Sequence, residues 1–141
     1  MRKGYLFLWL FALVWSTGCS SSWSFQKIDV QKKIAGSTNF EDFREVTESK
    51  QVERVVALLK EADWQTMKVD MARYADYQLD IQLKNDEGSD TQFVRYLLWV
   101  EANGERLELT KGTDQYVKIQ GADAKELYEL LTGNVNKERE F

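Results

Sequence analysis

The chain has 141 residues, a formal net charge of −4, no histidine, no proline and a single cysteine. That length suits one domain with a substantial core. Without histidine the chain lacks the usual general base near neutral pH, which excludes imidazole-dependent catalytic triads and zinc sites built from His and Cys. A net acidic chain is also a poor partner for nucleic acid, because phosphate contacts dominate that affinity. We therefore expect no metal, no cofactor and no nucleic-acid partner.

Residues 1–18 have the pattern of a secretory signal peptide. Arg2 and Lys3 precede an apolar run from Tyr5 to Trp15, which is shorter than the roughly 20 residues of a spanning helix, and small residues follow it. Cys19 comes directly after these small residues, as in a bacterial lipobox, where the cysteine becomes the lipidated N-terminus. A lone cysteine cannot form an internal disulfide. Lipidation explains both where this cysteine lies and why the chain has no second one. The alternative is an ordinary cleaved signal peptide that leaves Cys19 as a free thiol.

Lipidation at Cys19 predicts a protein held on the extracytoplasmic face of the cell membrane. Loss of the two basic leader residues would lower the net charge from −4 to −6. Residues 19–24 would form a short tether, residues 25–133 one domain, and residues 134–141 a charged tail. A tether of this length reaches at most about 20 Å, which keeps the domain close to the bilayer.

The first half of the domain predicts strand, short strand and helix. Alternating apolar residues from Ile28 predict a strand that ends at Gly36, and a short strand is expected at 43–46. Residues 48–63 predict a helix with Ser49 as N-cap. Its buried stripe consists of Val52, Val55, Val56 and Leu59.

The second half predicts four strands and a second helix. Residues 76–84 alternate cleanly, which is typical of a strand with one buried face, whereas residues 92–101 are apolar on both faces and predict a central strand. Asn103-Gly104 predicts a two-residue hairpin leading to strands at 106–110 and 115–120. Asp123 and Glu126 have capping-box spacing and predict the start of a final helix, and Gly133 is its predicted C-cap. The buried stripe of this helix consists of Leu127, Leu130 and Leu131.

This order of elements predicts the α+β class. We expect an antiparallel sheet of about four to six strands with two helices packed on one face. Trp64 and Trp99 are expected in the core. An acidic turn at 85–90 carries Asp86, Glu87 and Asp90, but the spacing of a calcium-binding EF-hand is not met, so we interpret it as a hairpin turn.

Two groups of residues are candidate contact sites. The loop before the alternating strand carries Arg73, Tyr74, Asp76 and Tyr77, a mixture typical of protein interfaces but also of a loop that covers one end of a core. The other group lies near the expected anchor and would contact the membrane; it consists of Trp23, Lys27, Lys32 and Lys33.

Aromatic and aliphatic motifs between residues 25 and 132 resemble the YhfM-like family of small lipoproteins from bacilli. The resemblance rests on a tryptophan at the end of the first helix, an Asp-Met pair before an Asp-Tyr strand, and a tryptophan in the following hairpin. The matching positions are Trp64, Asp70, Met71, Asp76, Tyr77 and Trp99. The resemblance implies an extracytoplasmic lipoprotein and implies no particular activity.

The sequence thus favours a lipid-anchored binding or accessory module that acts near the membrane surface, with a possible envelope protein as partner. One alternative is an enzyme that uses paired carboxylates on envelope polymers. Another is a carrier of a small ligand, which would require an apolar cavity between the sheet and the helices.

Overall fold

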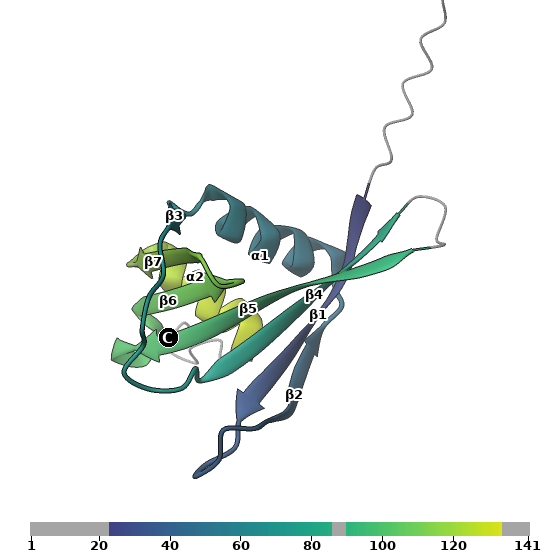
Figure 1. Ribbon diagram of the computed structural model, residues 1–141. Helices are drawn as coiled ribbons and strands as arrows, with labels where there is room; N and C mark the ends of the chain where they lie inside the picture. Colours follow the sequence, from purple (N-terminus) through teal and green to yellow (C-terminus); the bar gives the residue numbers. More distant parts are fainter. Residues whose placement is uncertain (1–22, 86–89, 134–141) are drawn as a thin grey trace, which may run out of the picture.

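The computed structural model describes residues 23–85 and 90–133, which form one sheet and two α-helices (Figure 1). In chain order the elements are β1 (Trp23–Lys33), β2 (Phe40–Val46), α1 (Ser49–Glu61), β3 (Gln65–Thr66), β4 (Tyr77–Asn85), β5 (Thr91–Glu101), the 3-10 turn η1 (Ala102–Gly104), β6 (Arg106–Lys111), β7 (Gln115–Gln120) and α2 (Ala122–Thr132).

The sheet is antiparallel throughout and its seven strands follow the order β2-β1-β4-β5-β6-β7-β3. The α+β prediction is confirmed, with one more strand than expected, because a two-residue β3 adds to β7. β2 is seven residues long and starts before the expected residue 43. β1 begins at Trp23, two residues before the expected domain start, so residues 23 and 24 belong to the sheet and not to a tether. Its end is at Lys33, short of the expected Gly36.

Both helices cover one face of the sheet, and the core lies between these two layers. The alternation predicted for β4 is confirmed, since Leu79 and Ile81 are buried in the core while Gln78 and Asp80 face the opposite side. β5 is the middle strand of the seven, as its apolar character on both faces predicted. The helices contribute the predicted stripes, with Leu58 and Ala124 buried in addition and Leu130 only half-buried.

The helix starts differ from their predicted caps. Glu48, not Ser49, is the N-cap of α1, and its side chain makes no capping hydrogen bond. The predicted capping box at the second helix is also wrong, because α2 begins at Ala122 after Gly121. The C-cap prediction is confirmed, since Gly133 adopts the left-handed conformation at φ 70°.

The turn between β5 and β6 is longer than the predicted two-residue hairpin. Glu101 pairs with Arg106, so four residues make the connection, and Asn103 adopts positive φ within η1. Gly104 is buried under the ring of Tyr128 on α2. A turn that packs against a helix needs this extra length, whereas a tight hairpin would stay clear of α2.

The 67–76 segment leads from β3 to β4 and passes β7 and β6 on its way (Figure 1). It covers part of the sheet face that the helices leave open. Trp99 lies beneath it and donates its indole N–H to the carbonyl oxygen of Arg73 at 2.9 Å. Trp99 is therefore buried, as predicted, but on the face opposite the main core.

Candidate functional site

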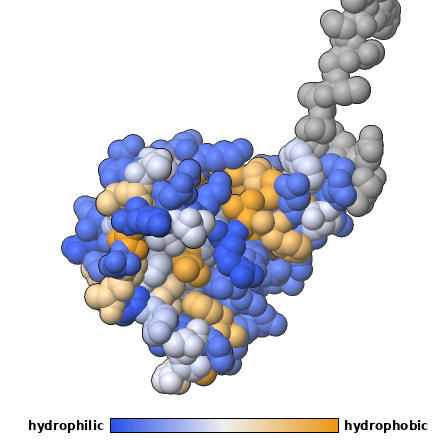
Figure 2. Space-filling view, viewed as in Figure 1, coloured by the Kyte–Doolittle hydropathy of each residue, from blue (hydrophilic) through white to orange (hydrophobic). Residues whose placement is uncertain are grey.

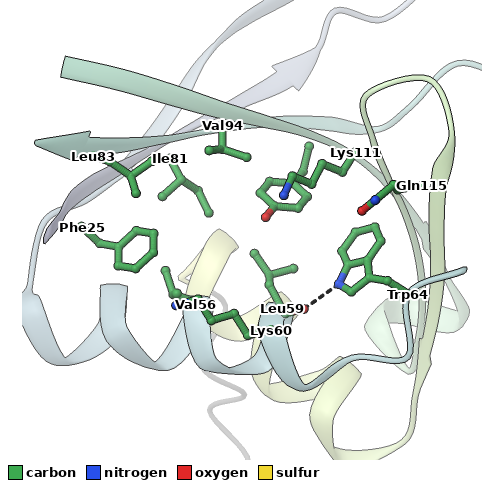
Figure 3. A pocket seen from close by; sticks show the side chains of 11 residues that line it. Phe25, Val56, Leu59, Lys60, Trp64, Ile81, Leu83, Val94, Lys111 and Gln115 are labelled. Atoms are coloured by element: carbon green, nitrogen blue, oxygen red, sulfur yellow. Dashed lines mark hydrogen bonds between the residues drawn. The ribbon is translucent and has the colours of Figure 1, made fainter. Parts of the chain in front are cut away.

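An apolar pocket of about 350 Å³ lies between α1 and the helix-covered face of the sheet. Figure 2 shows apolar side chains at the surface between α1 and the neighbouring strands, and Figure 3 shows the side chains that face one another across the pocket. We call this cavity the α1 pocket. Its lining consists of Phe25, Val56, Leu59, Lys60, Trp64, Ile81, Leu83, Val94, Tyr96, Lys111 and Gln115.

A β-bulge at the start of β1 directs Phe25 into the α1 pocket. Phe25 pairs with Leu83 and Ile28 pairs with Ile81. The two partners on β4 are two positions apart, whereas Phe25 and Ile28 are three positions apart. In a regular strand such a spacing would put the two side chains on opposite faces, and the register shift between Phe25 and Lys27 removes that difference. Both apolar side chains therefore face α1.

Trp64 closes the other end of the α1 pocket. Its indole N–H donates to the carbonyl oxygen of Leu59 at 2.6 Å, which satisfies a free carbonyl in the last turn of α1. Its ring lies 5.7 Å from the ring of Tyr96 on β5. The prediction that Trp64 belongs to the core is only partly right, because its ring is half-buried and forms a pocket wall.

Two lysines border the α1 pocket. Lys60 Nζ lies 5.0 Å from the centre of the Phe25 ring, and Lys111 Nζ lies 5.9 Å from the centre of the Tyr96 ring. Burial raises the pKa of the Tyr96 phenol, so this group stays protonated at neutral pH and can donate a hydrogen bond. None of the described residues that line the pocket carries a carboxylate.

The predicted partner-binding residues are mostly used within the fold. Arg73 donates to a carboxylate oxygen of Asp76 at 2.7 Å and to the carbonyl oxygen of Val100 at 3.1 Å. The second oxygen of Asp76 accepts the backbone N–H of Val100 at 2.7 Å, which ties the 67–76 segment to β5. Tyr77 is buried in the core. Tyr74 alone of the four is largely exposed, at 65%.

A second groove of about 400 Å³ lies on the opposite face of the sheet, between the 67–76 segment and the strands beneath it. We call it the second-face groove. Met67, Met71, Leu97 and Trp99 supply apolar walls. Among the described residues that line this groove there is again no carboxylate, and Arg73 is the one charged residue.

The predicted membrane-contact residues lie along the whole length of β1. Trp23 pairs with Asn85 at one end of β4, whereas Lys32 pairs with Tyr77 at the other. Trp23 and Lys32 are nine positions apart, which is a distance of about 30 Å along a strand. Lys27 forms ion pairs with Asp29 at 3.4 Å and Glu45 at 3.8 Å. These residues, with Lys33, can meet one bilayer together only if β1 lies along it.

Lys32 and Lys33 instead border a polar hollow of about 290 Å³ at the far end of β1. Asp76, Tyr77 and Tyr128 also line it. Burial and the neighbouring hydroxyl of Tyr128 raise the pKa of Tyr77 to about 12. Both residues also make contacts within the fold. Lys32 Nζ lies 5.6 Å from the centre of the Phe43 ring, and the backbone N–H of Lys33 donates to the carbonyl oxygen of Asp76.

Several predicted features lie outside the described residues. These are the signal peptide, Cys19, the charged tail and, in the acidic turn, Asp86 and Glu87. Within residues 23–85 and 90–133, no three His, Cys, Asp or Glu side chains gather in a way that could hold a metal ion. The same residues contain no helix long and apolar enough to cross a membrane.

A sequence profile of the YhfM protein family matches residues 22–137. The chain belongs to the YhfM family. No curated protein matches this family member significantly. Among solved structures, it is similar to a thioesterase-like protein from Clostridium sporogenes ATCC 15579, with a TM-score of 0.54 and 17% sequence identity. The likeness covers 76% of this chain and 94% of the other. At that identity it shows that the YhfM-family chain shares a fold with that protein, and nothing about its activity.

The sequence alone did not reveal the α1 pocket of this YhfM family member. Lys60 reads as one of several charged residues on the outer face of a helix, and Lys111 reads as part of a turn. Phe25 breaks the alternation of β1, and only the bulge explains it. The one usable signal was Trp64, which directly follows a helix end and recurs in the family resemblance.

Proposed function

We propose that this YhfM family member is a lipid-anchored, extracytoplasmic binding module that takes an apolar ligand into the α1 pocket. The observation that carries this proposal is the pocket itself, a cavity of about 350 Å³ between sheet and helix with an apolar lining. Binding sites for small molecules are concave and mostly apolar, with a few polar groups that orient the ligand.

The chemistry of the pocket walls supports binding over catalysis. The enzyme alternative raised by the sequence requires paired carboxylates, and no carboxylate of the described residues lines the α1 pocket or the second-face groove. The polar groups that can orient a ligand in the α1 pocket belong to Lys60, Tyr96, Lys111 and Gln115. These observations favour the ligand-carrier alternative raised by the sequence.

The position of the pocket supports a role near the bilayer. Six residues lead from Cys19 to Phe25, which lines the pocket. Such a stretch spans at most about 20 Å. If Cys19 carries the lipid anchor, Phe25 in the wall of the α1 pocket lies within that distance of the membrane, where apolar molecules are abundant.

The proposal is tested by filling the pocket. Val94 lines it and is half-buried, whereas Phe93, the next residue along β5, points to the opposite face and is 59% exposed. The substitution Val94→Trp should weaken binding of the neutral fluorophore N-phenyl-1-naphthylamine by at least about tenfold, because a bulky ring occupies the ligand's place. The matched control Phe93→Trp should bind the fluorophore as the unmodified protein does. Fluorescence titration of each folded variant measures both.

Two results would contradict the proposed function. One is absence of fluorophore binding by the unmodified protein; the other is equal binding by both tryptophan variants, since this would place the fluorophore elsewhere. Circular dichroism establishes that each variant is folded. If Val94→Trp does not fold, Leu83→Trp fills the same pocket from β4, where a half-buried strand position tolerates an aromatic residue.

A further inference from the structure

We propose that the ligand of the α1 pocket is an anionic amphiphile, with one alkyl chain in the apolar cavity and a carboxylate or phosphate head held at its border by Lys60 or by Lys111. This inference rests on the proposed function and specifies the class of ligand. It is carried by the combination of an apolar cavity with two cations at its border.

The two lysines come from different layers of the fold. Lys60 lies in the last turn of α1, and Lys111 ends β6, opposite Tyr96 on β5. Figure 3 shows both side chains extending along the pocket, with Gln115 beside Lys111. A cation is therefore available on the helix side, where Lys60 Nζ lies over the Phe25 ring, and another on the sheet side, where Lys111 Nζ lies over the Tyr96 ring.

Neither ammonium group is neutralised by a carboxylate of the described residues. Four arginines of the same region are each paired with a carboxylate within 3.1 Å; these are Arg54, Arg73, Arg95 and Arg106. Lys60 and Lys111 form no ion pair there and instead contact aromatic rings that line the cavity. The chain has a net charge of −4. Two cations that no described carboxylate neutralises, placed beside an apolar cavity, give charge complementarity to an anionic ligand.

A simpler interpretation is that the lysine stems only cover apolar surface while their charged ends stay in water. Substitution of the lysines by methionine distinguishes this interpretation from the proposal, because methionine keeps an unbranched apolar side chain of similar length and removes the charge. If the stems alone matter, Lys→Met substitutions leave the preference for anionic ligands unchanged. If the charge holds a head group, these substitutions abolish the preference.

The experiment compares three ten-carbon probes in displacement of N-phenyl-1-naphthylamine. Decanoate carries a carboxylate, decyl phosphate carries a phosphate, and decanol has the same chain without charge. The unmodified protein should bind at least one anionic probe about tenfold more tightly than decanol, which corresponds to one charge-assisted hydrogen bond. The double variant Lys60→Met, Lys111→Met should bind all three probes with similar affinity.

The matched control is Lys118→Met on β7. Lys118 is exposed and faces away from the helices, and its loss changes the net charge without touching the pocket. This variant should keep the preference for the anionic probe. Raising the salt concentration should reduce the preference in the unmodified protein, because exposed charges are screened.

Each outcome decides the inference. Preference for decanoate alone identifies a fatty-acid head, and preference for decyl phosphate alone identifies a phosphorylated head. Preference for both identifies a general anion site. Each of these three results supports the inference if the lysine double variant loses the preference. Equal binding of decanol and the anionic probes, or a preference that survives in the double variant, overturns it and leaves the proposed function standing. If neither the fluorophore nor any probe binds, the proposed function fails as well.

Discussion

Single residues decide whether this fold has a pocket. Phe25 forms one wall only because the bulge between Phe25 and Lys27 turns its side chain toward α1. Trp64 forms another wall because its indole N–H is tied to the last turn of the helix. Apolar residues in a different rotamer or register would fill the same space as ordinary core.

Asp76 has a comparable role on the opposite face. Its two oxygens bind Arg73 and the backbone of Val100, so the carboxylate that sequence patterns associate with a partner is used to fix the 67–76 segment. A polar loop that crosses a sheet must satisfy its own backbone and side-chain hydrogen bonds, and Arg73 and Asp76 do this here. Their role in binding a partner stays a prediction. Patterns of residue types do not distinguish these two uses.

Gly104 is the glycine whose replacement should be most damaging. A Cβ there would lie 2.5 Å from Cδ1 of Tyr128, and its φ of +91° is unfavourable for any other residue. We expect Gly104→Ala to lower the free energy of unfolding by about 3 kcal/mol, from backbone strain and overpacking together. Gly112→Ala is the control, with φ +63° but open space around it, and should cost about 1 kcal/mol.

Urea unfolding followed by circular dichroism measures both alanine variants. The difference between them isolates the contact between η1 and α2. Equal losses for Gly104→Ala and Gly112→Ala would mean that η1 does not pack against Tyr128 as described.

At the scale of elements, α1 and α2 are linked by a bidentate ion pair. Arg54 Nε and Nη2 donate to the two oxygens of Glu126 at 2.6 and 2.8 Å. The hydrogen bond from Arg54 lowers the pKa of Glu126 below its ordinary value. The pair therefore stabilises the fold above the ordinary glutamate pKa of about 4.3, and this contribution is lost as the pH falls through the lowered pKa.

We predict a pH-dependent effect of Glu126→Gln. The variant should unfold at a lower temperature than the unmodified protein at pH 7. The difference should shrink as the pH falls below the ordinary glutamate pKa of about 4.3 and through the lowered pKa of Glu126. Because both side chains are partly exposed, high salt should shrink the difference. Glu129→Gln on the same helix removes a carboxylate that forms no ion pair with a described residue, and it should show no such dependence. Thermal scans at several pH values test this; a difference that does not shrink as the pH falls below the ordinary glutamate pKa would contradict it.

The sequence predicted most elements, and the misses have physical causes. Strands β4 to β7 and both helices follow from hydrophobic period and turn residues. β3 has only two residues, so no periodicity can reveal it. β2 is almost entirely exposed and charged, which hides its pairing with β1. Helix caps and the length of the η1 turn depend on tertiary contacts that local sequence does not encode.

At the scale of the whole molecule, the pocket results from how α1 and the sheet meet. Large side chains hold the two layers together at Val56 and Leu59, while Phe25 and Trp64 stand at the two ends and leave a cavity between them. Sequence patterns could predict that these layers pack, but not that the packing is incomplete. This cavity depends on volumes and rotamers across six separate elements, and this information becomes available only in three dimensions.

The most direct test of the account is a map of where an apolar ligand binds. The measurement is a series of amide ¹H–¹⁵N spectra of residues 23–141 during titration with N-phenyl-1-naphthylamine. We predict that the largest shifts fall on Phe25, Val56, Tyr96 and Lys111 around the α1 pocket, while the second-face groove near Met71 stays unchanged. Shifts centred on the second-face groove, or no saturable shifts at all, would contradict the claim that the α1 pocket is the binding site.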